Sequence, residues 1–447
     1  MTYEAAVDAL YKLGHELAGT PSHKFDLAYM RVMLDALAHP ERRFASVLIA
    51  GTNGKGSTAA TLSSILLAAG YKTGLYTSPH LVKINERIRV NGDQVDDCGF
   101  AAAFDHVETV AKALVETKAL PWHPSFFEML TAMAFEIFAR AGIQIAVLEV
   151  GMGGRLDATN VVEPLISVIT DISLDHQKFL GNTIAEIAVE KAGIIKPNGT
   201  VVTLPQHPAA NDVIGNAILQ RKARGVSAVK HMPPVSPGAM GYADVEGRNR
   251  YELEVIGEVI EVDSPLPGRH QLRNLALAIT TAEELAKFGF PVTAKQVEQG
   301  IRETRWLGRF QVVTASENRL AREVIFDVAH NPDGAWALRS ALSEKIGDRP
   351  FTLVFGAMHD KAFREMVQIL FPTAQQIVVT QAKNPRAATT GELAEAAEAV
   401  GSEVVQCDSV GEAVRKAAEL TPADGVIVVT GSIFVVGEAM QAVHVQI

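Results

Sequence analysis

The amino-acid sequence predicts an α/β protein of two domains, each built around a largely parallel β-sheet. The chain has 447 residues, more than one ordinary domain contains. Short apolar runs alternate with long segments of helical periodicity, which is typical of βαβ units. A second α/β pattern of the same kind begins after Trp306.

The composition narrows the class of protein. Hydrophobic residues make up 48% and charged residues 21%, a balance typical of globular proteins. The formal net charge of −10 argues against non-specific binding to nucleic acids or anionic membranes, which requires clustered cations. Cys98 and Cys407 lie far apart, without metal-ligand spacing. We therefore expect a cytoplasmic protein without a signal peptide, membrane span, disulfide framework or structural zinc site.

The first domain is predicted from apolar runs and the helical segments between them. Four runs are predicted to be buried strands: 46–50, 145–150, 165–170 and 200–204. Segments 57–69 and 126–141 have helical periodicity. From about Val226 to Gly247 the chain is rich in Pro, Gly and polar residues, and 251–262 then alternates like a hairpin around Gly257. We interpret this stretch as an insertion or edge feature of the first domain.

The second domain repeats the strand–helix pattern. Its predicted strands are 324–328, 351–355, 376–379 and 426–430, and 411–420 is a predicted helix. The helical segment 294–302 and the short stretch 303–308 mark the predicted boundary. The domains are therefore expected at 1–303 and 304–447, and clefts between such domains commonly bind ligands.

One glycine-rich segment carries the strongest functional signal. Gly51–Ser57 (GTNGKGS) directly follows a predicted strand and directly precedes a predicted helix. Backbone N–H groups, the helix dipole and Lys55 would together form a phosphate cradle. Gly56 separates Lys55 from Ser57, so the segment is a variant of the usual Walker pattern. The alternative is a glycine-rich turn without a ligand. The predicted phosphate contacts are Asn53, Gly54, Lys55, Gly56 and Ser57.

Several further motifs accompany this loop in order along the chain. They are TSPHL at 77–81, LEVGMGGRLDATN at 148–160, LDHQKFLGNTIAEIAVEKAGIIK at 174–196, DVAHNP at 327–332 and GAMHDK at 356–361. Together with GTNGKGS, these blocks resemble the folylpolyglutamate synthase and dihydrofolate synthase family, a branch of the Mur ligase superfamily. The resemblance implies an N-terminal P-loop-type parallel-sheet ATPase domain and a smaller C-terminal Rossmann-like α/β domain.

A magnesium site is indicated by Glu149, which ends an apolar run. The carboxyl ends of parallel strands face the ligand crevice, and Mg²⁺ prefers hard oxygen ligands such as carboxylates. The resemblance implies ATP as the nucleotide and two Mg²⁺ ions. It assigns Ser78, Glu149 and His176 as metal ligands and places Ser57 close to the nucleotide-bound metal. His is an unusual Mg²⁺ ligand, and the alternative for His176 is a hydrogen-bonded loop histidine.

Lys191 lies on a predicted helix that begins with a capping box from Thr183 to Glu186. Ile184, Ile187 and Lys191 recur at spacings of three and four, so they share one face. An unpaired charge on an apolar stripe is expensive. The resemblance implies that Lys191 is carbamylated and lies near the second metal. The alternative is a lysine whose ammonium reaches the surface.

The acceptor site is implied by resemblance in three short segments: Asp26-Leu27-Ala28, Ser125-Phe126-Phe127-Glu128 and Leu156-Asp157-Ala158. The adjacent phenylalanines could stack on a pterin ring. Ala28 departs from the glycine of bifunctional family members, which bears on specificity. Glu128 also fits a capping box with Ser125, so it could simply cap the helix.

The remaining predicted contacts lie later in the chain. The resemblance assigns Asn274, Arg309 and Asp327 to ATP. Taken singly, they could instead be a capping Asn, a surface Arg and an Asp that begins a loop. His330 and Asn331 are candidates for contacting glutamate in a cleft that faces the second domain.

The expected function is an ATP-dependent ligase that adds L-glutamate to dihydropteroate and to folate polyglutamates through an acyl phosphate. Lys55, Glu149, His176 and Lys191 would carry the chemistry. The expected partners are these small molecules alone, and the resemblance implies a monomer. One alternative is a folylpolyglutamate synthase without the first activity. Another Mur-type ligase acting on a UDP-sugar peptide, a phosphate-loop kinase or NTPase switch, and a non-catalytic nucleotide-binding regulator are less favoured.

Overall fold

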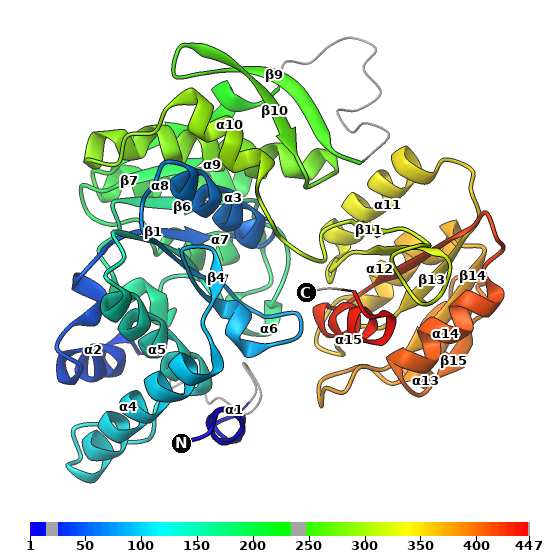
Figure 1. Ribbon diagram of the computed structural model, residues 1–447, viewed down its shortest axis with the longest axis horizontal. Coiled ribbons are helices and arrows are strands. Elements are labelled where there is room, and N and C mark those ends of the chain that lie inside the picture. The colour runs from blue at the N-terminus through cyan, green and yellow to red at the C-terminus, as the bar shows by residue number, and fades with distance from the viewer. Residues whose placement is uncertain (15–25, 234–246, 446–447) are drawn as a thin grey trace. The chain divides into compact units, whose positions relative to one another are not determined.

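A computed structural model describes residues 1–14, 26–233 and 247–445. The chain divides into two compact units (Figure 1). The first comprises Met1–Met232, Leu253–Ile260 and Arg273–Glu303, and the second Pro233–Glu252, Glu261–Leu272 and Thr304–Ile447. The predicted α/β class with two domains is confirmed. The predicted boundary also lies between Glu303 and Thr304, but the second unit takes in two segments that the sequence had placed in the first.

The first unit is built on an eight-stranded sheet in the order β4-β3-β2-β5-β1-β6-β7-β8. Its strands are β1 Ala45–Ala50, β2 Thr73–Tyr76, β3 Ile88–Val90, β4 Asp93–Gln94, β5 Ile145–Glu149, β6 Ile166–Ile169, β7 Thr200–Thr203 and β8 Arg224–Ser227. The run from β2 to β8 is parallel, and β3 and β4 add antiparallel strands at one edge. β1 and β5 are buried along almost their whole length, which is why they read as continuous apolar runs.

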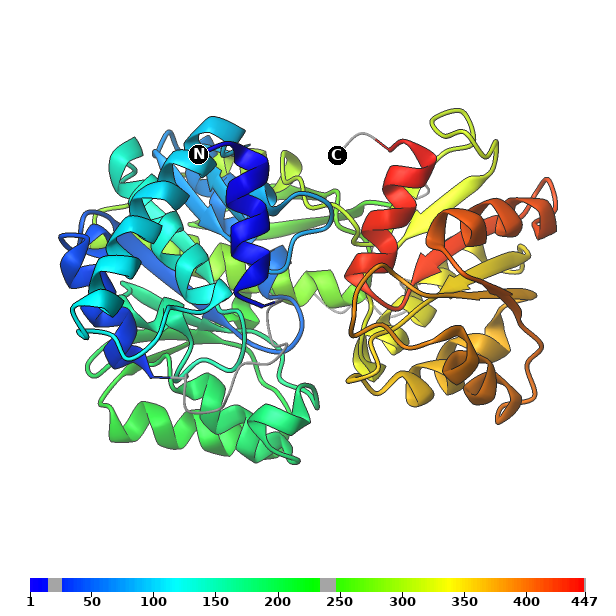
Figure 2. The same cartoon turned by 90° about the horizontal axis from the view of Figure 1, so that it is seen from below.

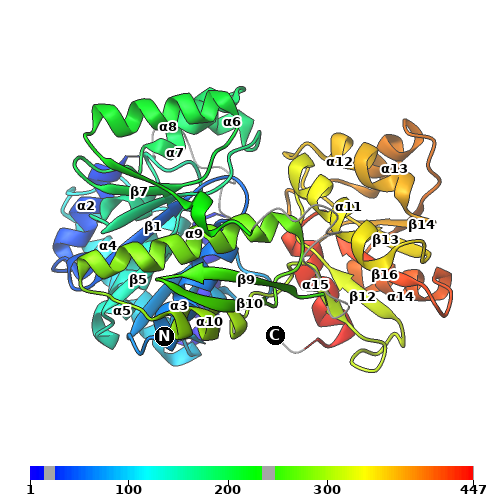
Figure 3. The same cartoon turned by 90° about the horizontal axis from the view of Figure 1, so that it is seen from above.

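Ten helices of the chain precede residue 303 in the described part. They are α1 Tyr3–Lys12, α2 Leu27–Ala36, α3 Lys55–Ala68, α4 Asp97–Glu116, α5 Phe126–Ala141, α6 Gln177–Leu180, α7 Ile184–Ala192, α8 Pro208–Gln220, α9 Arg269–Leu285 and α10 Ala294–Arg302. Short 3-10 helices occur at η2 Pro40–Arg42, η3 Ile84–Arg87, η4 Ala158–Val161, η5 Ala228–His231 and η6 Ala286–Phe288. α1 packs against α4 (Figure 2), and α7 packs against α8 (Figure 3).

The hairpin that the sequence predicted is present, but it is not an edge of the large sheet. β9 Asn249–Val255 and β10 Glu258–Ser264 form a separate two-stranded sheet. The turn lies at Ile256 and Gly257, both of which have positive φ. Strand β8 was not predicted, because its sequence, RGVS, has little apolar character and lies mostly exposed at the sheet edge.

The second unit contains a six-stranded sheet in the order β11-β12-β16-β13-β14-β15. The strands are β11 Gln311–Val313, β12 Glu323–Phe326, β13 Phe351–Phe355, β14 Gln376–Thr380, β15 Val405–Cys407 and β16 Val426–Thr430. All pairs are parallel except β11 with β12. The helices are α11 Pro332–Ile346, α12 Phe363–Leu370, α13 Thr390–Glu398, α14 Val410–Leu420 and α15 Ile433–Val443, with a 3-10 turn η7 Phe371–Thr373. No helix of the described residues is both long and apolar enough to cross a membrane.

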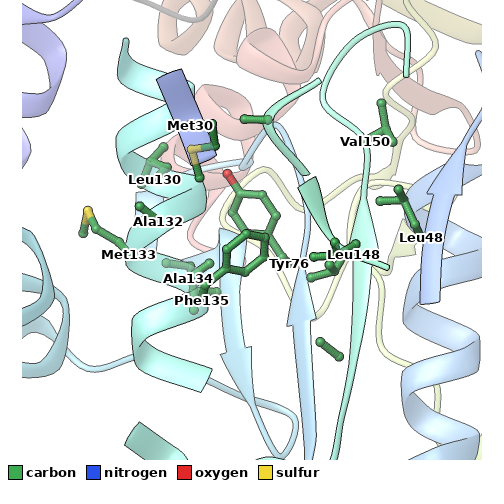
Figure 4. Close-up of a cluster of buried hydrophobic side chains, with 14 of the residues drawn as sticks. Met30, Leu48, Tyr76, Leu130, Ala132, Met133, Ala134, Phe135, Leu148 and Val150 are labelled. Carbon is green, nitrogen blue, oxygen red and sulfur yellow. The ribbon is translucent and has the colours of Figure 1, made fainter. Parts of the chain in front are cut away.

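The core of the first unit lies directly under the strand ends that matter for function. Tyr76 at the end of β2 is fully buried, and its hydroxyl lies 3.2 Å from the Thr131 hydroxyl of α5. Phe135 and Leu148 gather around it (Figure 4). Tyr76 immediately precedes the TSPHL segment, and Leu148 immediately precedes Glu149. Close packing of this cluster therefore fixes where two of the candidate site segments begin.

Candidate functional site

Three loops leave the carboxyl ends of neighbouring parallel strands in the first unit. β1 lies between β5 and β6, and the register pairs Ile49 with Glu149 and Ala50 with Ile169. The segments that follow Ala50, Glu149 and Ile169 therefore emerge side by side. This edge is where ligands bind in open α/β sheets.

The glycine-rich segment has the geometry of a phosphate-binding loop. Gly54 has φ +87°, a left-handed conformation that favours glycine, and α3 begins at the next residue. Lys55 folds back over the loop, with its ammonium donating to the carbonyl oxygens of Gly51 and Thr52 at 3.1 Å each. The N–H groups of the first turn of α3 have no partner within the helix, and the helix dipole makes this end attractive to anions.

Hydrogen bonds from the segment that follows β6 fix the start of the glycine-rich loop. The Asp171 carbonyl accepts from the backbone N–H groups of Thr52 at 2.8 Å and Asn53 at 3.2 Å. Thr52 and Ser173 exchange two further hydrogen bonds, each 3.1 Å long. These bonds engage the amides at the start of the loop, so the N–H groups left to face a ligand come from its later part.

Asn274, on the first turns of α9, lies against this loop. A Cβ atom on Gly54 would come within 2.1 Å of Asn274 Oδ1, so only glycine leaves room for the asparagine. Asn274 is itself buried. The structure thus brings Asn274 and the loop together, as the sequence predicted for one side of a nucleotide site.

Lys191 also reaches the loop. It is 4% exposed, and its Nζ donates to the Gly51 carbonyl at 2.7 Å. The capping box between Thr183 and Glu186 at the start of α7 is confirmed. The ammonium does not reach the surface, so the alternative of a lysine extended to solvent is wrong. Carbamylation of Lys191 stays a prediction.

Glu149 and Ser78 lie next to each other, and both have side-chain oxygen atoms that can bind a metal ion. The Glu149 carboxylate is 5% exposed and accepts from the Ser78 backbone N–H at 3.1 Å. The Ser78 hydroxyl is buried, and the described residues offer it no hydrogen-bond partner. A buried hydroxyl on a residue that also binds a carboxylate through its backbone fits a hard cation such as Mg²⁺.

His176 lies on the neighbouring loop, after β6. Its backbone is left-handed, with φ +50°, and its side chain is 24% exposed. The backbone N–H donates to the Asp175 carboxylate at 2.8 Å. Within the described ranges, no three His, Cys, Asp or Glu side chains cluster closely enough to bind a metal by themselves. A magnesium site at this edge therefore depends on hydroxyl ligands, on a modified lysine or on the nucleotide.

The helices that carry or adjoin the three predicted acceptor segments pack on one another. α2, which carries Leu27 and Ala28, packs on α5 and on η4, and α5 also packs on η4. Asp26 is the N-cap of α2, and its carboxylate accepts from the Ala28 N–H at 2.8 Å. Asp157 is the N-cap of η4. Several of the predicted acceptor residues thus have structural partners as well.

The two phenylalanines of the second segment have different surroundings. Phe126 is buried and stacks on Tyr11, with ring centroids 5.7 Å apart. Phe127 is half-buried, and a Cβ on Gly151 would come within 2.5 Å of its ring. The Phe127 ring therefore packs directly against Gly151, where a side chain would collide with it. The position of Phe127 next to the loop after β5 makes it the better candidate for contacting a flat heterocycle.

Glu128 caps its helix, as the alternative reading held. One carboxylate oxygen accepts from both the N–H and the hydroxyl of Ser125 at 2.7 Å. A small cavity lined by Tyr29, Met30, Met33, Leu120, Trp122, Pro124 and Glu128 lies behind it. That cavity has room for about a single water molecule, so a pterin does not fit there.

Asp157 is fully enclosed and holds the loop after β5 in shape. It accepts hydrogen bonds from the N–H groups of Met152 and Thr159 at 3.0 Å. Burial raises the pKa of Asp157, and these hydrogen bonds act in the opposite direction. The neighbouring Leu156 is half-buried and Ala158 buried, so Leu156 is the more accessible of the two.

The second unit gathers the remaining predicted residues at the end of β12. The Asp327 carboxylate accepts from the N–H groups of Phe310 and Ala329 at 2.9 Å. Burial raises its pKa, while the Arg309 charge and these amides oppose the shift. The Arg309 guanidinium lies 5.9 Å from the centre of the Trp306 ring. Arg309 and Asp327 are thus neighbours, as expected of two contacts to one ligand.

His330 and Asn331 follow directly, before α11. His330 Nδ1 donates to the Val328 carbonyl at 3.0 Å, which orients the ring. Asn331 is 2% exposed and caps α11, its side-chain oxygen accepting from the Gly334 N–H at 2.8 Å. Of the two glutamate candidates, His330 is the more accessible.

A buried polar network that the sequence did not reveal lies beside Ser78. Arg87 is 1% exposed, and its Nε donates to His80 Nδ1 at 2.8 Å. His80 Nε2 lies 3.3 Å from the Tyr11 hydroxyl, and the guanidinium lies 5.4 Å from the Phe126 ring centre. The Arg87 carbonyl also accepts from the Thr77 N–H at 2.9 Å. The only signal in the sequence was the position of His80 within TSPHL.

Comparisons with known proteins find matches to both parts of the chain. Residues 49–282 match the Mur ligase middle domain, and residues 308–433 match the Mur ligase glutamate ligase domain. The fold and the loop thus define a Mur-type ligase. More narrowly, the chain belongs to the folylpolyglutamate synthase and dihydrofolate synthase family within that superfamily.

Individual relatives cover most of the chain. A Bacillus subtilis protein named dihydrofolate synthase/folylpolyglutamate synthase is 35% identical over 83% of this chain and 84% of its own length. A Mycobacterium tuberculosis folylpolyglutamate synthase solved with ADP and AMPPCP is 33% identical, with a TM-score of 0.86 over 98% of each chain. A Haloferax volcanii protein, named as a probable bifunctional folylpolyglutamate synthase/dihydropteroate synthase, is 34% identical over 98% of this chain. The chain spans 50% of that relative's length.

Proposed function

We propose that this protein is an ATP-dependent ligase that joins L-glutamate to dihydropteroate and to folates, which it extends to polyglutamates. The observation that carries the proposal is the phosphate loop after β1, with Lys55 and Lys191 both directed to its Gly51 carbonyl. The Lys55 ammonium there would suit the phosphates of ATP, and Lys191, once carbamylated, would suit their Mg²⁺. Membership of the family and the names of its relatives supply the acceptor and the amino acid.

The first step would transfer a phosphoryl group. An oxygen of the acceptor carboxylate attacks the γ-phosphorus of ATP, the bond to the β-phosphate oxygen breaks, and ADP leaves. Lys55, released from the Gly51 and Thr52 carbonyls, would offset charge on the transferring group together with the α3 amides. Ser78, Glu149, His176, Ser57 and carbamylated Lys191 would hold Mg²⁺, which when bound supplies charge stabilisation to the phosphate and acyl phosphate oxygens.

The second step would form the amide. The glutamate nitrogen, after losing a proton, attacks the acyl carbon, and the tetrahedral intermediate expels phosphate with the oxygen that came from the carboxylate. We assign acceptor binding to the segments at 26–28, 125–128 and 156–158, with Phe127 against the pterin and Glu128 acting as the cap of α5. His330 is the proposed glutamate contact, and Asn274, Arg309 and Asp327 the further nucleotide contacts. The domain at 1–303 would bind ATP and acceptor, and that at 304–447 the glutamate.

The second candidate is a folylpolyglutamate synthase that does not use dihydropteroate. Ala28, which stands where bifunctional family members have glycine, favours it. Asp26 and Ala28 lie at the start of α2 and are both exposed, so a change there alters the rim of the acceptor site. We also propose that the enzyme acts as a monomer in the cytoplasm, where its two free cysteines would stay reduced.

The deciding experiment follows ADP release by the purified protein with Mg²⁺, ATP and L-glutamate. Dihydropteroate and tetrahydrofolate are compared as acceptors. Turnover with both supports the bifunctional reading, and turnover with tetrahydrofolate alone supports the second candidate. Turnover with neither, although ADP still binds, overturns the folate assignment.

The intermediate has its own test. With an acceptor carboxylate labelled with ¹⁸O, an acyl phosphate places one labelled oxygen in each phosphate released. Unlabelled phosphate would contradict the mechanism. Lys55→Met, with Lys72→Met as a surface control outside the site, should abolish turnover with either acceptor.

A further inference from the structure

An ion pair outside the predicted site joins the phosphate loop to the helix that carries Asn274. Arg273 Nε lies 2.8 and 3.0 Å from the two carboxylate oxygens of Asp171, and a terminal nitrogen of Arg273 lies 2.6 Å from one of them. The same nitrogen donates to the Pro205 carbonyl at 2.9 Å. The arginine thus fastens α9 to the ends of two sheet strands, β6 and β7. Such a multiply bonded pair fixes geometry more firmly than a single contact.

Each partner is one step from the candidate nucleotide site. The backbone carbonyl of Asp171 accepts from the N–H groups of Thr52 and Asn53, so the residue supports the loop directly. Arg273 immediately precedes Asn274, which occupies the space left by the missing Cβ of Gly54. The contacts therefore connect the loop to itself: Asp171 supports the loop and binds Arg273, and Asn274, the next residue, contacts the loop again.

The ion pair also neutralises a negative charge close to the loop. A carboxylate beside a loop meant for a polyanion would repel the ligand, and the repulsion would act over the Debye length of about 8–10 Å. Arg273 neutralises that charge. The two side chains are 29% and 38% exposed, so added salt can reach and screen them.

We propose that Asp171 and Arg273 are positioning residues for nucleotide binding: their ion pair sets Asn274 against the phosphate loop and cancels a negative charge that would otherwise oppose the phosphates. The proposal rests on the proposed function for the identity of the ligand. It assigns neither residue a contact with the nucleotide. Its consequence is that the two substitutions are coupled, with loss of the arginine more harmful when the aspartate remains.

The test uses Arg273→Met, Asp171→Asn and the double variant, with ADP binding to the full-length protein measured by calorimetry in Mg²⁺. Arg273→Met should weaken ADP binding and raise the KM for ATP by about three- to tenfold, with kcat and the KM of the acceptor little changed. The double variant should recover much of that loss, because the repelling charge is gone. Arg273→Lys, which retains the charge but not the planar fork, should lie between.

Two controls separate positioning from general damage. Arg140→Met removes an arginine from its 2.7 Å pair with Glu136 on α5, and should leave ADP binding unchanged. The gap between Arg273→Met and the double variant should narrow as salt is raised. Thermal unfolding of each variant shows whether it is folded.

Two results would overturn the inference: ADP binding by Arg273→Met equal to that of the wild type, or a double variant whose loss is simply the sum of the two single losses. Because ADP binding is measured without acceptor or glutamate, failure of the proposed ligase reaction does not affect this outcome.

Discussion

Replacing Gly54 by alanine tests the loop geometry with a built-in control. The new Cβ would lie 2.1 Å from Asn274 Oδ1, on a residue with φ +87°. Gly289 has nearly the same backbone, φ +88°, but a Cβ there meets nothing within 4 Å. Gly289→Ala therefore carries the conformational strain without the collision, and the difference between the two variants isolates the approach of Asn274.

The magnitudes follow from these two terms. Placing alanine in the left-handed region costs about 1 kcal/mol at either position. At Gly54, the Asn274 side chain must also leave its rotamer and its contacts, which adds about 1–2 kcal/mol. We expect Gly54→Ala to lose about 2–3 kcal/mol of unfolding free energy and Gly289→Ala about 1 kcal/mol. ADP affinity should fall at least about tenfold in the first and stay unchanged in the second.

Urea unfolding and calorimetric titration with ADP measure both quantities. A double variant, Gly54→Ala with Asn274→Ala, should regain stability because the collision is removed, yet should still bind ADP weakly. Equal loss of stability in Gly54→Ala and Gly289→Ala would refute the tight approach. Wild-type affinity for ADP in Gly54→Ala would refute the use of this loop for nucleotide.

Three further predictions concern single side chains. Ser78→Ala should leave the unfolding free energy within about 0.5 kcal/mol, since the described residues give its buried hydroxyl no partner, but should raise the Mg²⁺ needed for half-maximal turnover about tenfold; an unchanged Mg²⁺ requirement would remove Ser78 from the metal site. Glu128→Gln should cost about 0.5–1 kcal/mol of unfolding free energy through the weakened cap and leave the acceptor KM nearly unchanged; a large rise in that KM would show that Glu128 contacts the acceptor. Burial lowers the pKa of His231 to about 4. Below the ordinary pKa of about 6.5, the unfolded chain therefore takes up a proton that the folded chain does not. The free energy of unfolding should fall as the pH falls from about 6.5 to 4, by up to about 1.4 kcal/mol per pH unit. Urea titrations at several pH values should show a shallower slope for His231→Gln, and an equal slope would contradict this assignment.

The parts of the fold that local sequence specifies were predicted closely. β13 and β16 match the predicted limits, as do α5 and α10. Central parallel strands are buried on both faces and read as uninterrupted apolar runs. Capping boxes at Ser125 and Thr183 are local hydrogen-bond patterns, which a sequence spells out directly. The edge strand β8 was not predicted, because most of its residues are exposed and its sequence therefore contains no apolar run.

The candidate site shows the same division. The sequence located the glycine-rich turn between β1 and α3 and the carboxylate that ends β5, because glycine at a turn and a polar residue at the end of an apolar run are local signals. It did not distinguish buried Phe126 from half-buried Phe127, although the two are adjacent. Which of two neighbouring side chains enters a core depends on the helix face that other elements cover.

What the sequence determined by itself was therefore the α/β class, the limits of its most apolar strands and of some capped helices, and the place of the glycine-rich turn. Only the tertiary structure decided that Lys191, 140 residues from Gly51, binds its carbonyl. It alone decided that Arg273 binds Asp171, 102 residues away. Local patterns record the hydrogen bonding and burial of neighbouring residues, whereas contacts between distant segments exist only once the sheet order and helix packing bring them together.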